Sequence, residues 1–164
     1  MIDLPEIIRQ LDLQGQAIRM LAQTFSEEQA DWKPSAETWS LREVMEHLYN
    51  EERLDFRRHL KGMFGELKPP AQRLEVESAR EGLEGFLAER QASLGYLAGL
   101  REPDWGIRKE FRFGPNETMT LSAGDMLVSW VEHDILHLRQ VVELMHACNA
   151  REASADAVTY AGGW

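Results

Sequence analysis

Hydrophobic residues recur at intervals of three and four along most of the chain, which is the spacing of an amphipathic helix. The pattern covers four long segments, at about 4–24, 41–62, 76–100 and from 120 or 122 to 147. Ser40 and Glu43 form a capping box at the start of the second segment. Because each helix must bury its apolar face, the pattern predicts an all-α protein, a four-helix bundle that spans residues 1–164 as one domain.

The connections between these segments contain prolines and aromatic residues. In the first connection Pro34 disfavours a helix, and Trp32 and Trp39 are expected to anchor the loop on the core. The alternative is that one of the two tryptophans forms the wall of a substrate pocket. The second connection contains Pro69 and Pro70, which also predict a loop.

A long connection precedes the last helix. Residues 107–113 alternate weakly between apolar and polar, so a short strand or hairpin is expected there, before Gly114 and Pro115. So long a connection is either the lid or rim of an active site or a plain crossover. After the last helix the periodic pattern ends, and Tyr160 and Trp164 predict that the C-terminal tail docks onto the helices.

Composition narrows the class of function. The chain has 164 residues and a formal net charge of −10, so it is long enough for a core and repels nucleic acids and anionic membranes. No apolar run approaches the length of about 18 residues that a membrane span needs, and no signal peptide is recognisable. Cys148 is the single cysteine, which excludes an internal disulfide and fits a reducing compartment. We therefore expect a cytoplasmic protein that acts on a small molecule.

The histidines carry the candidate chemistry. His133 and His137 lie four residues apart in the last predicted helix, so their imidazoles can converge on one point from one face. His47 lies among the apolar positions of the second helix. A histidine that faces a helical core must be neutral and hydrogen-bonded, or must bind something. The three residues are therefore candidate ligands of one metal ion, and the alternative is that they are hydrogen-bonded core groups.

The residues around these histidines resemble a known family. The segment 39–43, Trp-Ser-Leu-Arg-Glu, is followed by His47, and the last helix has the pattern His133-x-x-x-His137-x-x-Gln140. This order and spacing resemble the DinB-like family of small helical metal-binding proteins over nearly the whole chain. The resemblance implies a bundle with a three-histidine divalent metal site, commonly in a homodimer. It also implies a transferase or isomerase that uses a low-molecular-weight thiol such as bacillithiol, mycothiol or glutathione.

An open three-histidine site also has a chemistry of its own. Three imidazoles bind a divalent ion at about 2.0–2.1 Å and leave a position for substrate, which is typical of catalytic sites and not of structural ones. The ion can activate a thiol for S-transfer or a water molecule for hydrolysis. Imidazole suits several metals, of which zinc is expected first and nickel second. The sequence thus predicts a divalent-metal-dependent thiol S-transferase; the alternatives are a metal-dependent hydrolase and a non-catalytic metal-binding stress or interaction module.

Two polar residues are candidate partners of the metal ligands. Gln140 can hydrogen-bond a ligand or a water on the metal, or it is a surface amide. Glu51, one turn beyond His47, can orient that ring or act as a general base, or it pairs with an arginine at the surface. Asp134 is expected to face away from the metal. The two remaining histidines are expected to lie outside the site, in solvent.

Overall fold

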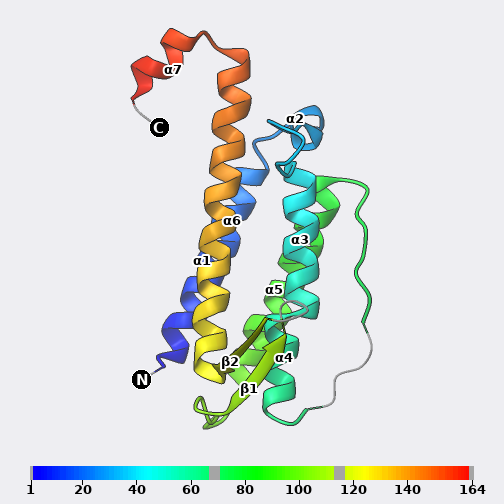
Figure 1. Ribbon diagram of the computed structural model, residues 1–164, viewed down its shortest axis with the longest axis vertical. Helices are drawn as coiled ribbons and strands as arrows, with labels where there is room; N and C mark the ends of the chain where they lie inside the picture. Colours follow the sequence, from blue (N-terminus) through cyan, green and yellow to red (C-terminus); the bar gives the residue numbers. More distant parts are fainter. Residues whose placement is uncertain (1, 67–70, 113–116, 163–164) are drawn as a thin grey trace.

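The structure is a computed structural model that describes residues 2–66, 71–112 and 117–162. Its elements, in chain order, are α1 (Leu4–Ala22), α2 (Glu27–Asp31), α3 (Leu41–Leu54), α4 (Phe56–Met63), α5 (Ala79–Gly99), β1 (Arg108–Arg112), β2 (Thr118–Ser122), α6 (Ala123–Glu152) and α7 (Ala155–Ala161). The predicted all-α class is confirmed, with a small two-stranded sheet added. Figure 1 shows α1, α3, α5 and α6 side by side along the long axis of the molecule.

Local side chains determine where the long helices begin. The predicted capping box of α3 is present, because Ser40 accepts a hydrogen bond from the backbone of Glu43 and the Glu43 carboxylate accepts one from Ser40. The same reciprocal pair, Ser122 and Asp125, begins α6. Ser78 accepts from the third residue of α5 in the same way. Each cap satisfies backbone N–H groups that a helix leaves without partners.

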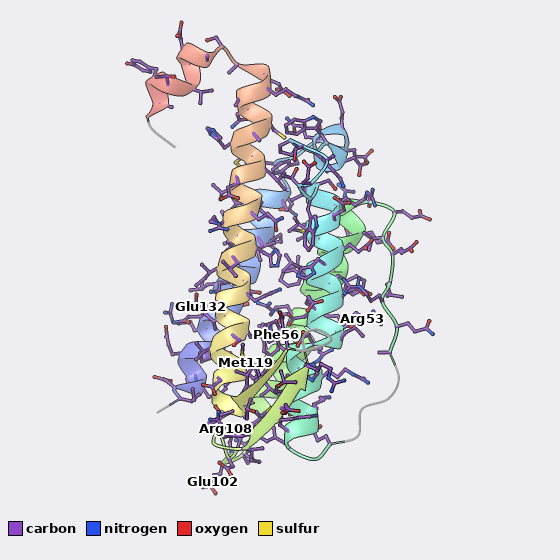
Figure 2. All side chains as sticks on the ribbon, in the orientation of Figure 1. Arg53, Phe56, Glu102, Arg108, Met119 and Glu132 are labelled. Atoms are coloured by element: carbon purple, nitrogen blue, oxygen red, sulfur yellow. The ribbon has the colours of Figure 1, made fainter. Side chains whose placement is uncertain are left out.

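Helix α3 packs most extensively on α5, and α1 packs on both α6 and α5. Gly82 of α5 lies so close to α3 that an added Cβ would stand 2.9 Å from the Cβ of Met45, so the glycine allows the two backbones to approach. Towards the other end of the molecule, where Figure 2 labels Phe56, the ring of this residue stacks on Trp130 of α6 with centroids 5.5 Å apart. Among the described residues, no helix is both long and apolar enough to cross a lipid bilayer.

The second predicted helix is interrupted, and the long connection contains a hairpin. At Asp55 the backbone leaves the helical region, with φ −111° and ψ −101°, so α3 and α4 are separate helices. Strands β1 and β2 pair antiparallel, with Arg108 opposite Ser122, and Phe111 of β1 is buried in the core. The predicted hairpin is therefore present. Gly114 and Pro115, like Pro69, Pro70 and Trp164, lie outside the described residues.

The prediction that the C-terminal tail docks onto the helices is wrong for its described part. Helix α7 has no buried residue, and Tyr160 is 96% exposed. Helix α6 has 30 residues, whereas α1, on which it packs, has 19. The end of α6 therefore extends beyond the other long helices and contacts the short α2, whereas α7 points away from the bundle (Figure 1).

Asn50 and Glu52 of α3, whose positions suggest solvated side chains, are buried instead, with exposures of 0% and 2%. Asn50 donates to the carbonyl of Leu74 and accepts from its backbone N–H, both at 2.8 Å, and so fastens the connection between α4 and α5 to α3. A helical pattern shows which face a residue occupies. It does not show that a distant loop covers that face.

Candidate metal centre

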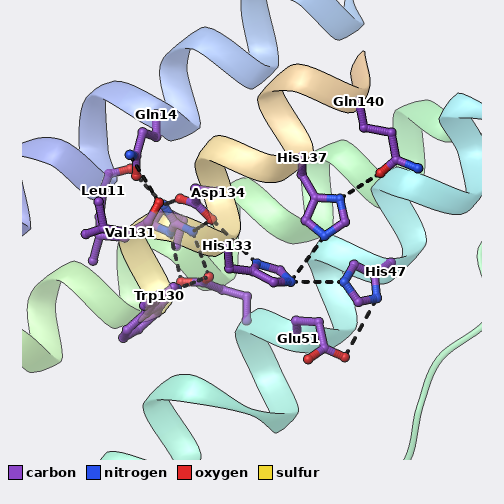
Figure 3. A network of polar contacts seen from close by, with 12 residues as sticks. Leu11, Gln14, His47, Glu51, Trp130, Val131, His133, Asp134, His137 and Gln140 are labelled. Atoms are coloured by element: carbon purple, nitrogen blue, oxygen red, sulfur yellow. Dashed lines mark hydrogen bonds and ion pairs between the residues drawn. The ribbon is translucent and has the colours of Figure 1, made fainter. Parts of the chain in front are cut away.

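The structure brings the three predicted ligands together. His47 projects from α3, and His133 and His137 project from successive turns of α6 (Figure 3). The Nε2 atom of His133 lies 3.0 Å from that of His47 and 3.2 Å from that of His137. All three residues offer a ligand nitrogen within 4.8 Å of the others. Helical spacing explains the pair on α6, and the contact of α3 with α6 adds the third ring.

The donor set fits a divalent ion. His137 Nδ1 lies 2.9 Å from Gln140 Oε1, and because an amide oxygen only accepts, Nδ1 carries the proton and Nε2 presents its lone pair to the centre. Two nitrogens that bind one tetrahedral ion at about 2.0–2.1 Å stand about 3.3 Å apart, close to the separations found here. A cation between the three Nε2 atoms could be held by the lone pairs of all three rings. Nitrogen ligands of this kind suit zinc and nickel.

Burial keeps the rings in the state that binds metal. It lowers the pKa of His47 to about 3, with a further contribution from the nearby His137 and His133 rings. Burial also lowers the pKa of His137, and the neighbouring His133 ring adds to the effect. His47 and His137 are therefore neutral at physiological pH, so each ring has one nitrogen whose lone pair can bind an ion.

The Nδ1 atoms of His47 and His137, which point away from the centre, face polar side chains. Gln140 contacts His137, which is the first of the two roles expected for it. A carboxylate oxygen of Glu51 lies 3.8 Å from His47 Nδ1 and 3.4 Å from an Arg73 nitrogen, so both arrangements expected for Glu51 occur together. Burial raises the pKa of Glu51, and a hydrogen bond with Asp55 raises it further. The carboxyl group therefore lies beside the site and holds a proton more readily than an exposed glutamate does.

A buried ionic cluster borders the site, and the sequence pattern did not predict it. Asp134 lies outside the ligand group, as expected, but one of its oxygens is 4.0 Å from His133 Nδ1. Arg90 of α5 is 1% exposed and binds Asp134 at 2.6 and 3.0 Å and Glu52 at 2.9 Å. One guanidinium faces two carboxylates, so the cluster has one negative charge in excess beside His133. The sequence feature that could have predicted the cluster is Arg90, which occupies an apolar position of its helix, four residues after Phe86.

The other two histidines lie outside the ligand cluster, as predicted, but both are only partly solvated. His146 of α6 is half-buried. His59 of α4 is also half-buried, with its ring centroid 4.9 Å from that of Phe111 in an edge-to-face arrangement and its Nε2 3.5 Å from Asp55. The structure therefore gives them no part in the metal centre.

Comparison with known proteins identifies the family. Residues 10–141 match the family model of the DinB superfamily. The chain belongs to the DinB superfamily. Its fold is similar to that in a crystal structure of a conserved protein from Enterococcus faecalis, with a TM-score of 0.65 and 15% identity over 90% of this chain and 97% of that one. No curated protein matches the chain.

The DinB-superfamily match includes the three histidines and Gln140, whereas α7 lies outside it. A pocket of about 570 Å³ opens beside this part of the chain, between α6 and the loop that precedes α3. Trp39 lines the pocket, is 41% exposed, and has its ring centroid 5.0 Å from His47 and 6.2 Å from His137. The prediction that Trp39 anchors the loop on the core is therefore wrong, and the alternative, a pocket wall, describes it. The described residues of the connection before α6 do not line this pocket.

Proposed function

We propose that the protein is a divalent-metal-dependent enzyme of the thiol S-transferase type. The observation that supports this is the convergence of three ring nitrogens within 4.8 Å, beside an open pocket. His47, His133 and His137 would hold the ion, with zinc as the first candidate and nickel as the second. When bound, such an ion acts as a Lewis acid that lowers the pKa of a thiol or a water molecule.

The chain's own residues bind and orient in this proposal. Gln140 holds the His137 ring with its Nε2 towards the centre, and Glu51 faces Nδ1 of His47. Trp39 provides an aromatic wall for the electrophilic co-substrate. The pocket opens on His137, so a small acceptor could reach the site through it; that acceptor and a low-molecular-weight thiol would be the two substrates of an S-transfer.

A metal-dependent hydrolase is the second candidate. The observation that favours it is the carboxyl pair of Glu51 and Asp55, because burial raises the pKa of both groups. A carboxyl group with a raised pKa beside a metal centre is suited to take a proton from water. A non-catalytic metal-binding module is the remaining candidate, and it would be supported by a bound metal without turnover.

Metal content tests the site first. Protein purified without added metal should contain close to one divalent ion per chain, measured by inductively coupled plasma mass spectrometry. His133→Ala should remove the ion, whereas His146→Ala, on the same helix but outside the cluster, should retain it. Less than about 0.2 ion per chain, with no binding on titration with zinc or nickel, would contradict the metal site.

Turnover then separates the candidates. The protein is incubated with bacillithiol, mycothiol or glutathione and an electrophile such as monochlorobimane, and conjugates are quantified by mass spectrometry. The proposal expects conjugation that disappears with a chelator and returns with the metal. Ester or amide hydrolysis without any thiol requirement would favour the hydrolase, and a loaded but inert protein would favour the binding module.

We further propose a homodimer, which the family resemblance implies. Large apolar side chains are exposed on two helices that pack together, with Met20 of α1 at 68% and Leu136 of α6 at 54%. Light scattering after size exclusion should give twice the chain mass of 18.8 kDa. Met20→Glu and Leu136→Glu should shift the mass towards the monomer, and a monomeric parent protein would refute the proposal.

A further inference from the structure

The pocket beside the metal centre is elongated along α6. One of its walls consists of the α6 residues His137, Gln140, Glu143, Leu144 and Ala147. Their spacing of three and four places them on one face of the helix. At about 1.5 Å of rise per residue, the wall extends about 15 Å from His137 to Ala147. The loop from 34 to 39 forms the opposite wall. A ligand that reaches the histidines therefore has room for a long body that points away from them.

The pocket wall combines apolar surface with negative charge. Pro34, Trp39 and Leu144 supply apolar surface. Glu37 and Glu143 supply carboxylates, and no lysine or arginine is among the described residues that line the pocket. Glu143 lies six residues beyond His137, or about 9 Å along the helix. The Glu143 carboxylate therefore belongs to the part of the α6 wall that lies away from the metal end of the pocket.

Both carboxylates are available to a ligand. Glu37 is exposed and makes no ion pair within the described part of the chain. A hydrogen bond with Ser35 lowers the pKa of Glu37, so it stays ionised at neutral pH. Glu143 pairs with Arg139 at 3.3 Å, but their side chains are 50% and 69% exposed. Such an exposed pair contributes little energy, and an incoming cation can replace Arg139.

We propose that this pocket binds an elongated amphiphilic ligand with a cationic, ammonium-type group at the end away from the histidines. The apolar body would lie against Trp39 and Leu144, and the ammonium group between Glu37 and Glu143. An ammonium group is attracted by two ionised carboxylates, and the apolar wall beside them suits the uncharged body of such a ligand. The proposal deepens the proposed function, on which it rests, because it assigns the acceptor substrate to this class. An anionic thiol such as glutathione would then approach the centre from outside this pocket.

Three probes of equal length test the charge preference. They are 4-phenylbutylamine, 4-phenylbutanol and 4-phenylbutyrate, titrated calorimetrically into the full-length protein after a chelator has removed metal. Without the metal, none of the three head groups gains affinity by coordination. The amine should bind at least about fivefold more tightly than the alcohol, and the butyrate should bind most weakly. This preference should decrease as salt is added.

Variants of the pocket residues test which side chains cause the preference for the amine. Glu37→Gln and Glu143→Gln together should abolish it, and Trp39→Leu should weaken all three probes. Glu132→Gln is the control, because Glu132 is an exposed α6 glutamate that does not line the pocket (Figure 2). Equal affinity for the three probes, or a preference that survives the double substitution, would overturn the inference. Amine selectivity in a protein that never takes up metal would instead refute the proposed function and leave this inference standing.

Discussion

Replacement of Arg90 by methionine should destabilise the protein more than any surface substitution. All five N–H groups of the guanidinium donate hydrogen bonds, to Glu52, Asp134 and the carbonyl of Leu11. Methionine keeps most of the side-chain volume but none of the charge. Arg90→Met would therefore leave two buried carboxylates facing each other without a cation.

The size of the effect follows from the burial of the cluster. Arg90, Glu52 and Asp134 are exposed by 1%, 2% and 1%, so solvent cannot compensate for the lost charge. Removal of one partner from a buried ion pair costs about 3–5 kcal/mol. With a urea dependence of about 2 kcal/mol per molar, the unfolding midpoint should fall by about 1.5–2.5 M.

The pH dependence gives a second signature. Burial raises the pKa of Asp134, but the Arg90 guanidinium more than offsets this effect and holds the pKa below its usual range. Without Arg90, burial is opposed only by the neighbouring His133, so the pKa of Asp134 should rise and the folded protein should hold a proton there more readily than the parent does. The loss of stability in Arg90→Met, relative to the parent protein, should therefore be largest at neutral pH and should shrink as the pH falls through the acidic range.

Urea unfolding followed by tryptophan fluorescence measures both effects. Arg9→Met is the matched control, because Arg9 pairs with Glu6 on the exposed side of α1, and its loss should leave the midpoint unchanged. A midpoint for Arg90→Met within about 0.5 M of the parent at pH 7 would show that the buried cluster does not hold the helices together.

Four further expectations follow from the same structure. Gly82→Ala should destabilise by about 1–3 kcal/mol because α3 blocks the new methyl group, whereas Gly95→Ala, with open space at its Cβ, should stabilise by about 0.5–1 kcal/mol; urea midpoints compare them. Cys148, 2% exposed and with a pKa raised by burial, should react with Ellman's reagent only after unfolding. In metal-free protein the stabilisation due to neutral His47 should be complete above about pH 6.5 and lost towards pH 3, and His47→Leu should flatten the midpoint-against-pH curve in this range. Deletion of 154–164 should leave the melting temperature measured by circular dichroism unchanged, because α7 has no buried residue.

The sequence alone was sufficient for features that depend on neighbours in the chain. The apolar period predicted the four long helical segments, and Ser40 with Glu43 predicted where α3 begins. His133 and His137 face the same way because residues four apart on a helix always do. These predictions succeeded because a helix is held by contacts within three or four residues, which the sequence displays directly.

Only the tertiary structure decided features that depend on what lies opposite a residue. Burial of Glu52 beside Arg90 requires a partner 38 positions away, and Asn50 is buried because the connection before α5 folds over it. Trp39 became a pocket wall because the histidine face of α6 passes beside its loop, and α7 stays exposed because it does not pack against the long helices. Periodicity gives the direction of a side chain, but burial, charge balance and the shape of a pocket depend on which segments meet across the core, and that is a property of the packed helices alone.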